Sequence, residues 1–129
     1  MAVGVWEPGK STIVSTEQLQ KLLSKVSETD LSRLSSTLDK EFMEGNVWMM
    51  KLKESAWQVA DALALEDLVD LIRFFTLAEM QLPGWEGGKQ NPVIYLAKIL
   101  KSRDEFSPEL RKWIRTNTDN RYLPYGAAL

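Results

Sequence analysis

Apolar side chains recur along this chain at three- and four-residue steps, and turn residues interrupt them at intervals. That spacing places apolar side chains on one face of an α-helix, and no segment keeps the two-residue alternation of a strand. Residues 15–82 are predicted to form four helices and residues 92–116 two more. The sequence therefore predicts an all-α, single-domain bundle of five or six helices, with an extended arm over residues 1–14 and an extended tail over residues 117–129.

Residues that can cap helices mark most of the predicted starts. Ser15 with Gln18 has the pattern of a capping box, and Thr29 or Asp30 can cap a second helix that stops at Gly45 and Asn46. Asn91-Pro92 and Ser107-Pro108 each place a capping residue before a proline in the first helical position. The two helices that follow them are expected to end near residues 103 and 116.

The middle of the chain is predicted to form helices over residues 47–63 and 65–81, which could also be one continuous helix because nothing between them breaks it. Within the first of these, Trp48-Met49-Met50 is typical of core, although a tryptophan beside two methionines can also form an adaptable binding surface. The side chains expected to face the core are Leu19, Leu22, Leu23, Val26, Leu31, Leu34, Leu38, Phe42, Trp48, Leu52, Ala56, Val59, Leu63, Leu68, Leu71, Ile72, Phe75, Ala78, Leu82, Val93, Leu96, Ala97, Leu100, Leu110, Trp113 and Ile114.

The strongest boundary is the loop at residues 83–91, where a proline and three glycines exclude a continuing helix. It carries Trp85, for which two interpretations stand. The ring could stack on a ligand or fill a partner's pocket, because tryptophan is enriched among the residues that dominate interfaces. It could instead fasten the loop to the bundle, because a large apolar ring is usually buried.

The amino-acid composition excludes several kinds of catalytic and metal-binding site. The 129 residues include no histidine and no cysteine, which removes the usual ligands of structural zinc and the thiol nucleophile. The beginning of the chain lacks the pattern of a signal peptide, and no apolar run is long enough for a membrane helix. We therefore expect a cytoplasmic protein without a cofactor, with no contact to a membrane.

Three patterns in the sequence resemble sites of chemistry. Gly4 to Ser11 match the letters of a phosphate loop, but too few residues precede Gly4 for the strand that such a loop requires. No serine stands in a hydrolase motif, and the usual histidine partner is missing. The carboxylates Asp61, Glu66, Asp67 and Asp70 could hold a divalent cation, although acids in the first turns of a helix also suit its dipole. No residue is therefore predicted to be catalytic or to bind a metal.

Charge divides unevenly between the two parts of the chain. Residues 1–88 carry 8 basic and 14 acidic side chains, and residues 89–129 carry 8 basic and 4 acidic ones. The two parts could neutralise each other, or the basic part could be an interaction surface. The residues Arg111, Lys112, Trp113, Arg115, Asn117, Arg121, Tyr122 and Tyr125 combine basic, amide and aromatic groups near the end of the chain.

The leading hypothesis is a small non-catalytic interaction or regulatory module that binds a protein partner, or a second copy of itself. The expected partner-binding residues are Trp85, Arg111, Lys112, Arg115, Arg121, Tyr122 and Tyr125. The first alternative is nucleic-acid binding through the basic-aromatic tail and the helix over residues 108–116, which could be the second helix of a helix-turn-helix, although the pI of about 5.2 disfavours it. The second alternative is a metal-dependent enzyme that uses Glu66, Asp67 and Asp70.

Overall fold

The computed structural model describes residues 13–125, and within that range the chain is all-α, as predicted. The part described contains six α-helices and four 3₁₀ segments and has no strand, so the predicted five or six helices are joined by additional short turns of helix. In chain order the elements are α1 (Thr16–Ser27), η1 (Leu31–Arg33), α2 (Leu34–Thr37), α3 (Lys40–Asn46), η2 (Val47–Lys51), η3 (Glu54–Ala62), α4 (Leu65–Gln81), η4 (Gly88–Gln90), α5 (Pro92–Ser102) and α6 (Pro108–Asn117).

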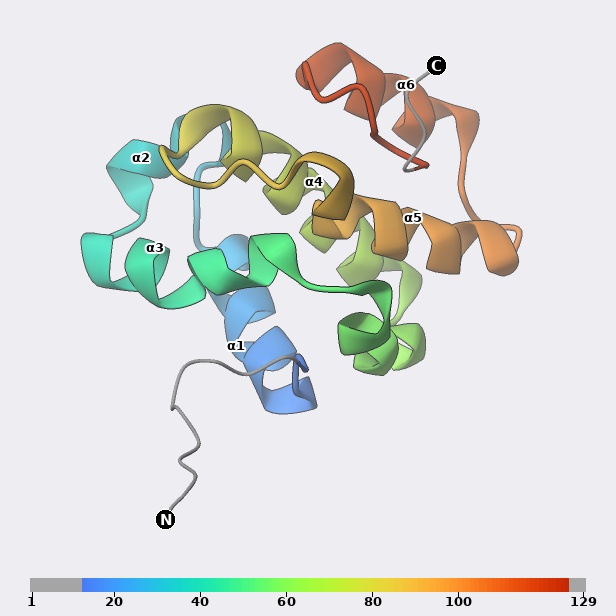
Figure 1. The fold of residues 1–129 in the computed structure, drawn as a ribbon, viewed down its shortest axis with the longest axis horizontal. Coiled ribbons are helices and arrows are strands. Elements are labelled where there is room, and N and C mark those ends of the chain that lie inside the picture. Colours follow the sequence, from blue (N-terminus) through green and yellow to red (C-terminus); the bar gives the residue numbers. More distant parts are fainter. Residues whose placement is uncertain (1–12, 126–129) are drawn as a thin grey trace.

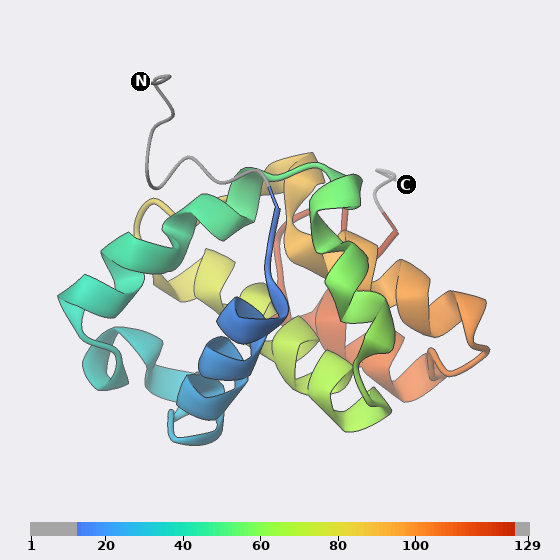
Figure 2. The same cartoon turned by 90° about the horizontal axis from the view of Figure 1, so that it is seen from below.

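Helix α4 is the central element of the bundle. It packs against α1, α2, α5 and α6, and Figures 1 and 2 show it crossing the middle of the molecule. Its bounds are those predicted, and the core-facing residues expected on it are all buried. Phe74 and Thr76 are also fully buried, so the helix is covered around most of its circumference. The Thr76 hydroxyl donates a hydrogen bond to the carbonyl of Ile72 at 2.7 Å, which satisfies the polar group inside the core.

The predicted caps at three helix starts are confirmed. The Ser15 hydroxyl accepts from the Gln18 backbone N–H at 3.1 Å while the Gln18 side chain accepts from the Ser15 N–H, which completes the capping box. Asn91 accepts from the Val93 N–H at 2.8 Å, and Ser107 accepts from the Leu110 N–H at 3.1 Å. These side chains satisfy N–H groups that lack a partner within the helix.

The single helix predicted from residue 30 to Gly45 is wrong. The chain forms η1 and α2, becomes extended at Leu38, and begins α3 with Asp39 as a new cap that accepts from the Phe42 N–H at 2.7 Å. Leu34 and Leu38 are buried as expected. The four-residue spacing of Leu34 and Leu38 fits a continuous helix, so the sequence gives no sign of the break between them and α3. Asp39 stabilises the break because its side chain caps the start of α3.

The α-helix predicted over residues 47–63 is also wrong, because this stretch forms η2 and η3 with extended backbone at Leu52 between them. A 3₁₀-helix has three residues per turn, so a different set of side chains faces the core. Met49, Met50 and Trp57 are buried, whereas Trp48 and Val59, expected inside, are only half-buried. The methionine pair is therefore core. Extended backbone at Leu63 and Ala64 separates this stretch from α4, so the two predicted helices are not continuous.

The first described residues pack on the helical bundle through Val14. Val14 is fully buried, and its backbone N–H donates to the carbonyl of Ala56 at 2.9 Å. Of the arm predicted over residues 1–14, residues 1–12, with the phosphate-loop letters from Gly4 to Ser11, lie outside the described range. Among the described helices, none combines the length and the apolarity needed to cross a membrane.

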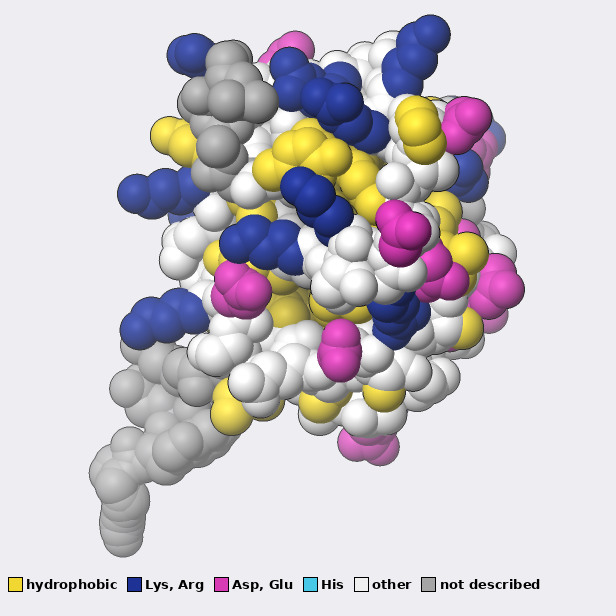
Figure 3. Space-filling model, turned by 90° about the vertical axis from the view of Figure 1, so that its right-hand side faces the viewer, with side chains coloured by type: hydrophobic (Ala, Val, Ile, Leu, Met, Phe, Trp, Pro, Cys, Tyr) yellow, Lys and Arg dark blue, Asp and Glu magenta, His cyan; other side chains and the backbone are white. Residues whose placement is uncertain are grey.

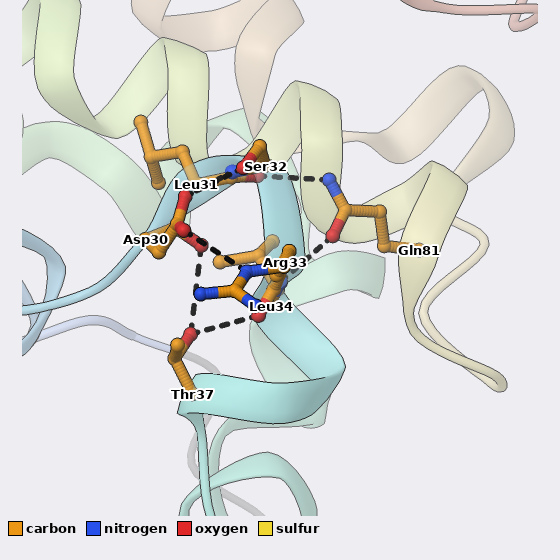
Figure 4. Close-up of polar contacts among 7 residues, drawn as sticks. All are labelled: Asp30, Leu31, Ser32, Arg33, Leu34, Thr37 and Gln81. Carbon is orange, nitrogen blue, oxygen red and sulfur yellow. Dashed lines mark hydrogen bonds and ion pairs between the residues drawn. The ribbon is translucent and has the colours of Figure 1, made fainter.

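The side-chain amide of Gln81 joins the end of α4 to the junction of η1 and α2 (Figure 4). Its Oε1 accepts from the Leu34 backbone N–H at 2.8 Å, and its Nε2 donates to the Leu31 carbonyl at 2.8 Å. On the other side of the junction, Asp30 accepts from the Ser32 hydroxyl and backbone N–H. These hydrogen bonds from Ser32 lower the pKa of the Asp30 carboxyl.

We predict that Gln81→Ala lowers the free energy of unfolding by about 1–3 kcal/mol, because it leaves two half-buried backbone groups without their partner. Urea unfolding followed by tryptophan fluorescence measures the change. The matched control is Gln20→Ala on the exposed face of α1, which should stay within about 0.5 kcal/mol of the parent protein. Equal stabilities of the two variants would show that solvent replaces the amide without cost.

Candidate functional site

The predicted loop at residues 83–91 folds inward rather than presenting its tryptophan. Trp85 is 2% exposed, and its ring meets that of Phe74 edge to face with the centroids 5.9 Å apart. The side chain therefore has no surface to offer a partner. This agrees with the interpretation that Trp85 fastens its loop to the bundle, and it removes the residue from the set of expected partner contacts.

The carboxylate of Glu79 on α4 holds this loop and the tail together. Its Oε2 accepts from the backbone N–H groups of Gly87 at 2.7 Å and Gly88 at 3.0 Å. Its Oε1 accepts from the side-chain amides of Asn91 at 3.0 Å and Asn120 at 2.9 Å. Hydrogen bonds to an ionised acceptor are the stronger ones in proteins, so this junction fixes two separate segments, the loop and the tail, against one helix.

The glycine at position 87 permits this arrangement. A Cβ on Gly87 would stand 2.8 Å from the carbonyl oxygen of Met50 and 2.9 Å from the Cα of Asn91, and both of these are backbone atoms. Neither atom can move without moving an element of the core. The close approach of the loop to η2 therefore requires glycine, and Asn120 completes the junction by donating to the Gly88 carbonyl at 2.9 Å.

The tail is predicted to be extended over residues 117–129, but residues 121–125 form turns and run back over α5 and α6. Residues 126–129 lie outside the described range. Leu123 and Pro124 are buried. The ring of Tyr125 then packs on Phe106 with the centroids 5.7 Å apart. The expectation failed because Leu123 provides an apolar contact, and a single such residue produces no periodic signal.

Two cations from different helices converge on the Tyr125 ring. The Lys101 Nζ lies 4.5 Å from the ring centroid and the Arg111 Cζ lies 5.8 Å from it. Both distances are in the range at which a positive charge is attracted to the face of an aromatic ring. The tail thus brings the end of α5 and the start of α6 into one site. Sequence reasoning missed Lys101, because its place in the site depends on the path of the tail.

We call the resulting patch the basic-aromatic surface, and it consists of Lys101, Arg111, Lys112, Arg115, Arg121, Tyr122 and Tyr125. Its five cations are exposed, Tyr122 is 36% exposed and Tyr125 is half-buried. Figure 3 looks onto the side of the molecule where α6 lies and shows Lys and Arg gathered around hydrophobic atoms in the upper part of that face. Within residues 13–125, none of the five cations has a carboxylate at ion-pair distance.

The two other C-terminal residues singled out from the sequence are structural. Trp113 is half-buried, and the guanidinium of Arg73 on α4 lies 5.6 Å from its ring centroid. The Asn117 side chain donates to the Trp113 carbonyl at 2.8 Å at the end of α6. The Arg73 contact attaches α6 to α4, against which the helix packs, and the Asn117 bond lies within α6. A helix-turn-helix would instead have α6 packed mainly on α5.

The acidic residues considered for a metal site are not brought together. Asp61 lies on η3, Glu66 and Asp67 lie in the first turn of α4, and Asp70 follows one turn later. Across the described residues, no three side chains of the metal-ligating types are grouped so that they could hold an ion. This finding gives the metal-dependent hypothesis no structural support.

The two oppositely charged parts of the chain scarcely neutralise each other. In the described structure one ion pair joins them, between Lys98 and Glu54 at 3.3 Å, and both side chains are about half exposed. The remaining ion pairs connect residues close in sequence. Mutual neutralisation therefore does not account for the positive charge of α6 and the tail.

Comparison with protein families, with curated proteins and with solved structures finds no match to this chain. The function is therefore argued from the geometry and charge of its surfaces.

We predict that Glu79→Gln lowers the free energy of unfolding by about 2–3 kcal/mol, because a carboxamide presents an NH₂ group to donors that need an acceptor. Urea unfolding gives the magnitude, and hydrogen exchange at the Gly87 and Gly88 amides locates the effect. The matched control is Glu86→Gln, an exposed acid in the same loop, which should leave both readouts unchanged. Unchanged exchange at the two glycines in Glu79→Gln would contradict the role assigned to this carboxylate.

Proposed function

We propose that this chain is a non-catalytic protein-interaction module that binds an acidic segment of a partner protein through the basic-aromatic surface. The observation that carries the proposal is the convergence of Lys101 and Arg111 on Tyr125, beside three further exposed cations, without a carboxylate partner in the described chain. Three of the six arginines in the sequence lie on this surface. Arginine and tyrosine are enriched at protein interfaces, and lysine is depleted there.

The geometry favours binding in two ways. Unpaired cations on one face attract an acidic partner over a distance and raise the rate of encounter. Tyr125 is held by Phe106 and by two cations, so part of the surface is ordered before a partner arrives, which reduces the entropy lost on binding. The partner in this proposal is a solvent-exposed stretch of aspartates and glutamates.

Nucleic acid is the second candidate, because phosphates would also satisfy these cations. The aromatic rings favour protein. Proteins bind single-stranded nucleic acid through bases that stack on exposed faces of aromatic side chains. Here the Tyr125 ring already carries Lys101 and Arg111, and the Trp113 ring carries Arg73. A second copy of the chain could also supply acids, since residues 1–88 hold 14 acidic side chains.

We also propose a cytoplasmic location. The sequence contains no cysteine, so the chain gains no disulfide from an oxidising compartment.

The test is a titration of the labelled protein with a short peptide of aspartates and glutamates, followed by fluorescence anisotropy at several salt concentrations. We expect saturable binding that weakens with salt. The variant R111Q/K112Q/R115Q should bind about 3- to 100-fold more weakly, because three exposed charge contacts of roughly 0.2–1 kcal/mol each are lost.

The control variant K21Q/K51Q/K53Q removes the same charge from exposed positions elsewhere and should bind like the parent protein. A single-stranded DNA of equal net charge is titrated in parallel, and light scattering records the mass. Stronger binding of DNA than of peptide would replace this proposal with the nucleic-acid hypothesis. Equal losses in the two triple variants would show that net charge alone is sensed, and a dimer that dissociates only in R111Q/K112Q/R115Q would make a second copy the partner.

A further inference from the structure

A cavity of about 470 Å³ opens between η3 and α5. Figure 2 shows these two elements side by side, η3 in bright green and α5 in orange. Concave sites for small molecules usually have volumes of roughly 300–1,000 Å³ and are lined by apolar and aromatic groups with a few polar ones. The lining of this cavity combines three apolar or aromatic side chains with five polar or charged ones, so it is more polar than most such sites.

The apolar part of the cavity is made of Trp57, Tyr95 and Ile99. Trp57 is 1% exposed and packs edge to face on Phe75 with the centroids 5.6 Å apart. Its backbone departs from helical angles and kinks η3 at this point. The Tyr95 hydroxyl donates to the Leu52 carbonyl at 3.1 Å. Both rings are therefore held in place by contacts outside the cavity, and the aromatic lining is formed before any ligand enters.

The polar part of the lining is acidic on balance. It contains the carboxylates of Glu54 and Asp61 and a single cation, Lys98, whose Nζ lies 3.3 Å from Glu54. Arg103 approaches Asp61 but donates to its backbone carbonyl, and it pairs with Glu105 instead. In the described range the Asp61 carboxylate has no cation at ion-pair distance, so one negative charge beside the aromatic rings is left without a partner.

We infer that this cavity binds a small aromatic amine, with the ligand ring against Tyr95 and Ile99, above the buried Trp57, and its ammonium group at Asp61. A cation in this position gains both from the unpaired carboxylate and from the nearby Tyr95 ring. An anion would meet two carboxylates and the one lysine that Glu54 already engages. The charge of the lining therefore selects amines over acids of the same shape. This inference does not depend on the function proposed for the basic-aromatic surface.

The experiment uses three probes with one phenol ring: tyramine, which is a cation, 4-ethylphenol, which is neutral, and 3-(4-hydroxyphenyl)propionate, which is an anion. The readout is the indole N–H resonance of Trp57 in ¹H–¹⁵N spectra of the full chain, assigned by its loss in Trp57→Phe. This N–H is buried and has no acceptor in the described chain, and Trp57 lines the cavity, so its shift reports on binding there.

Tyramine should shift this resonance saturably with a Kd on the order of 1 mM, and the neutral and anionic probes should bind progressively more weakly. Asp61→Asn should raise the Kd for tyramine about fivefold. Gln58→Phe, at an exposed position on the lining, should fill the cavity and abolish the shift. The matched control Asp67→Asn lies outside the lining and should bind tyramine like the parent protein.

Three results would overturn the inference: no saturable shift with any probe, equal affinity for all three probes, or tightest binding of the propionate. A loss of binding in Asp67→Asn equal to that in Asp61→Asn would do the same, because the effect would then follow net charge rather than the cavity. Asp61 is exposed, so its amide variant keeps the fold and the comparison can be read directly.

Discussion

The hydrogen bonds accepted by the Glu79 carboxylate are the interactions on which the arrangement of the chain after α4 depends. The carboxylate lies in the last turns of α4, where the helix dipole disfavours a negative charge. Donors from Gly87, Gly88, Asn91 and Asn120 offset that cost. The helix end, the loop and the tail are thus stabilised together, and the path of the chain into α5 and beyond α6 follows from this one acceptor. The basic-aromatic surface is a distant consequence, because Tyr125 reaches Lys101 and Arg111 only after Asn120 has turned the tail.

Local signals were enough to predict the helices whose starts are capped by their own sequence. The side chains of Ser15, Asn91 and Ser107 accept hydrogen bonds from backbone groups two or three residues away. The capping residue and the group that it caps are therefore visible together in a short stretch of sequence. The features that sequence reasoning missed depend on distant partners. Gln81 meets Leu34 across 47 positions and Glu79 meets Asn120 across 41. The spacing of apolar residues along the chain gives no information about such a contact.

The candidate site shows the same division. The cations of α6 and the tail could be named from composition, since exposed charge needs no partner to be recognised. The burial of Trp85 and the contact of Lys101 with Tyr125 could not be predicted from composition. The first depends on the fold of the loop and the second on the path of the tail. The replacement of an α-helix by η2 and η3 has a similar origin. Trp57 contributes to the core from a kink between short turns, and helical spacing assigns that place to Trp48 or Val59.

The distribution of charge separates what folds this protein from what it presents to others. The described ion pairs are exposed or half-exposed, and such pairs contribute little to stability, so the core from Val14 to Leu123 does not need them. The polar groups that join distant segments of the fold are the uncharged side-chain amides of Gln81 and Asn120 and the Glu79 carboxylate with its neutral donors. The cations around Tyr125 and the carboxylate of Asp61 lie outside this core, and Lys101 and Arg111 help to hold the Tyr125 ring. Neutralising them is expected to leave the core intact, so a loss of binding in such variants reports on the surface, including the order of Tyr125.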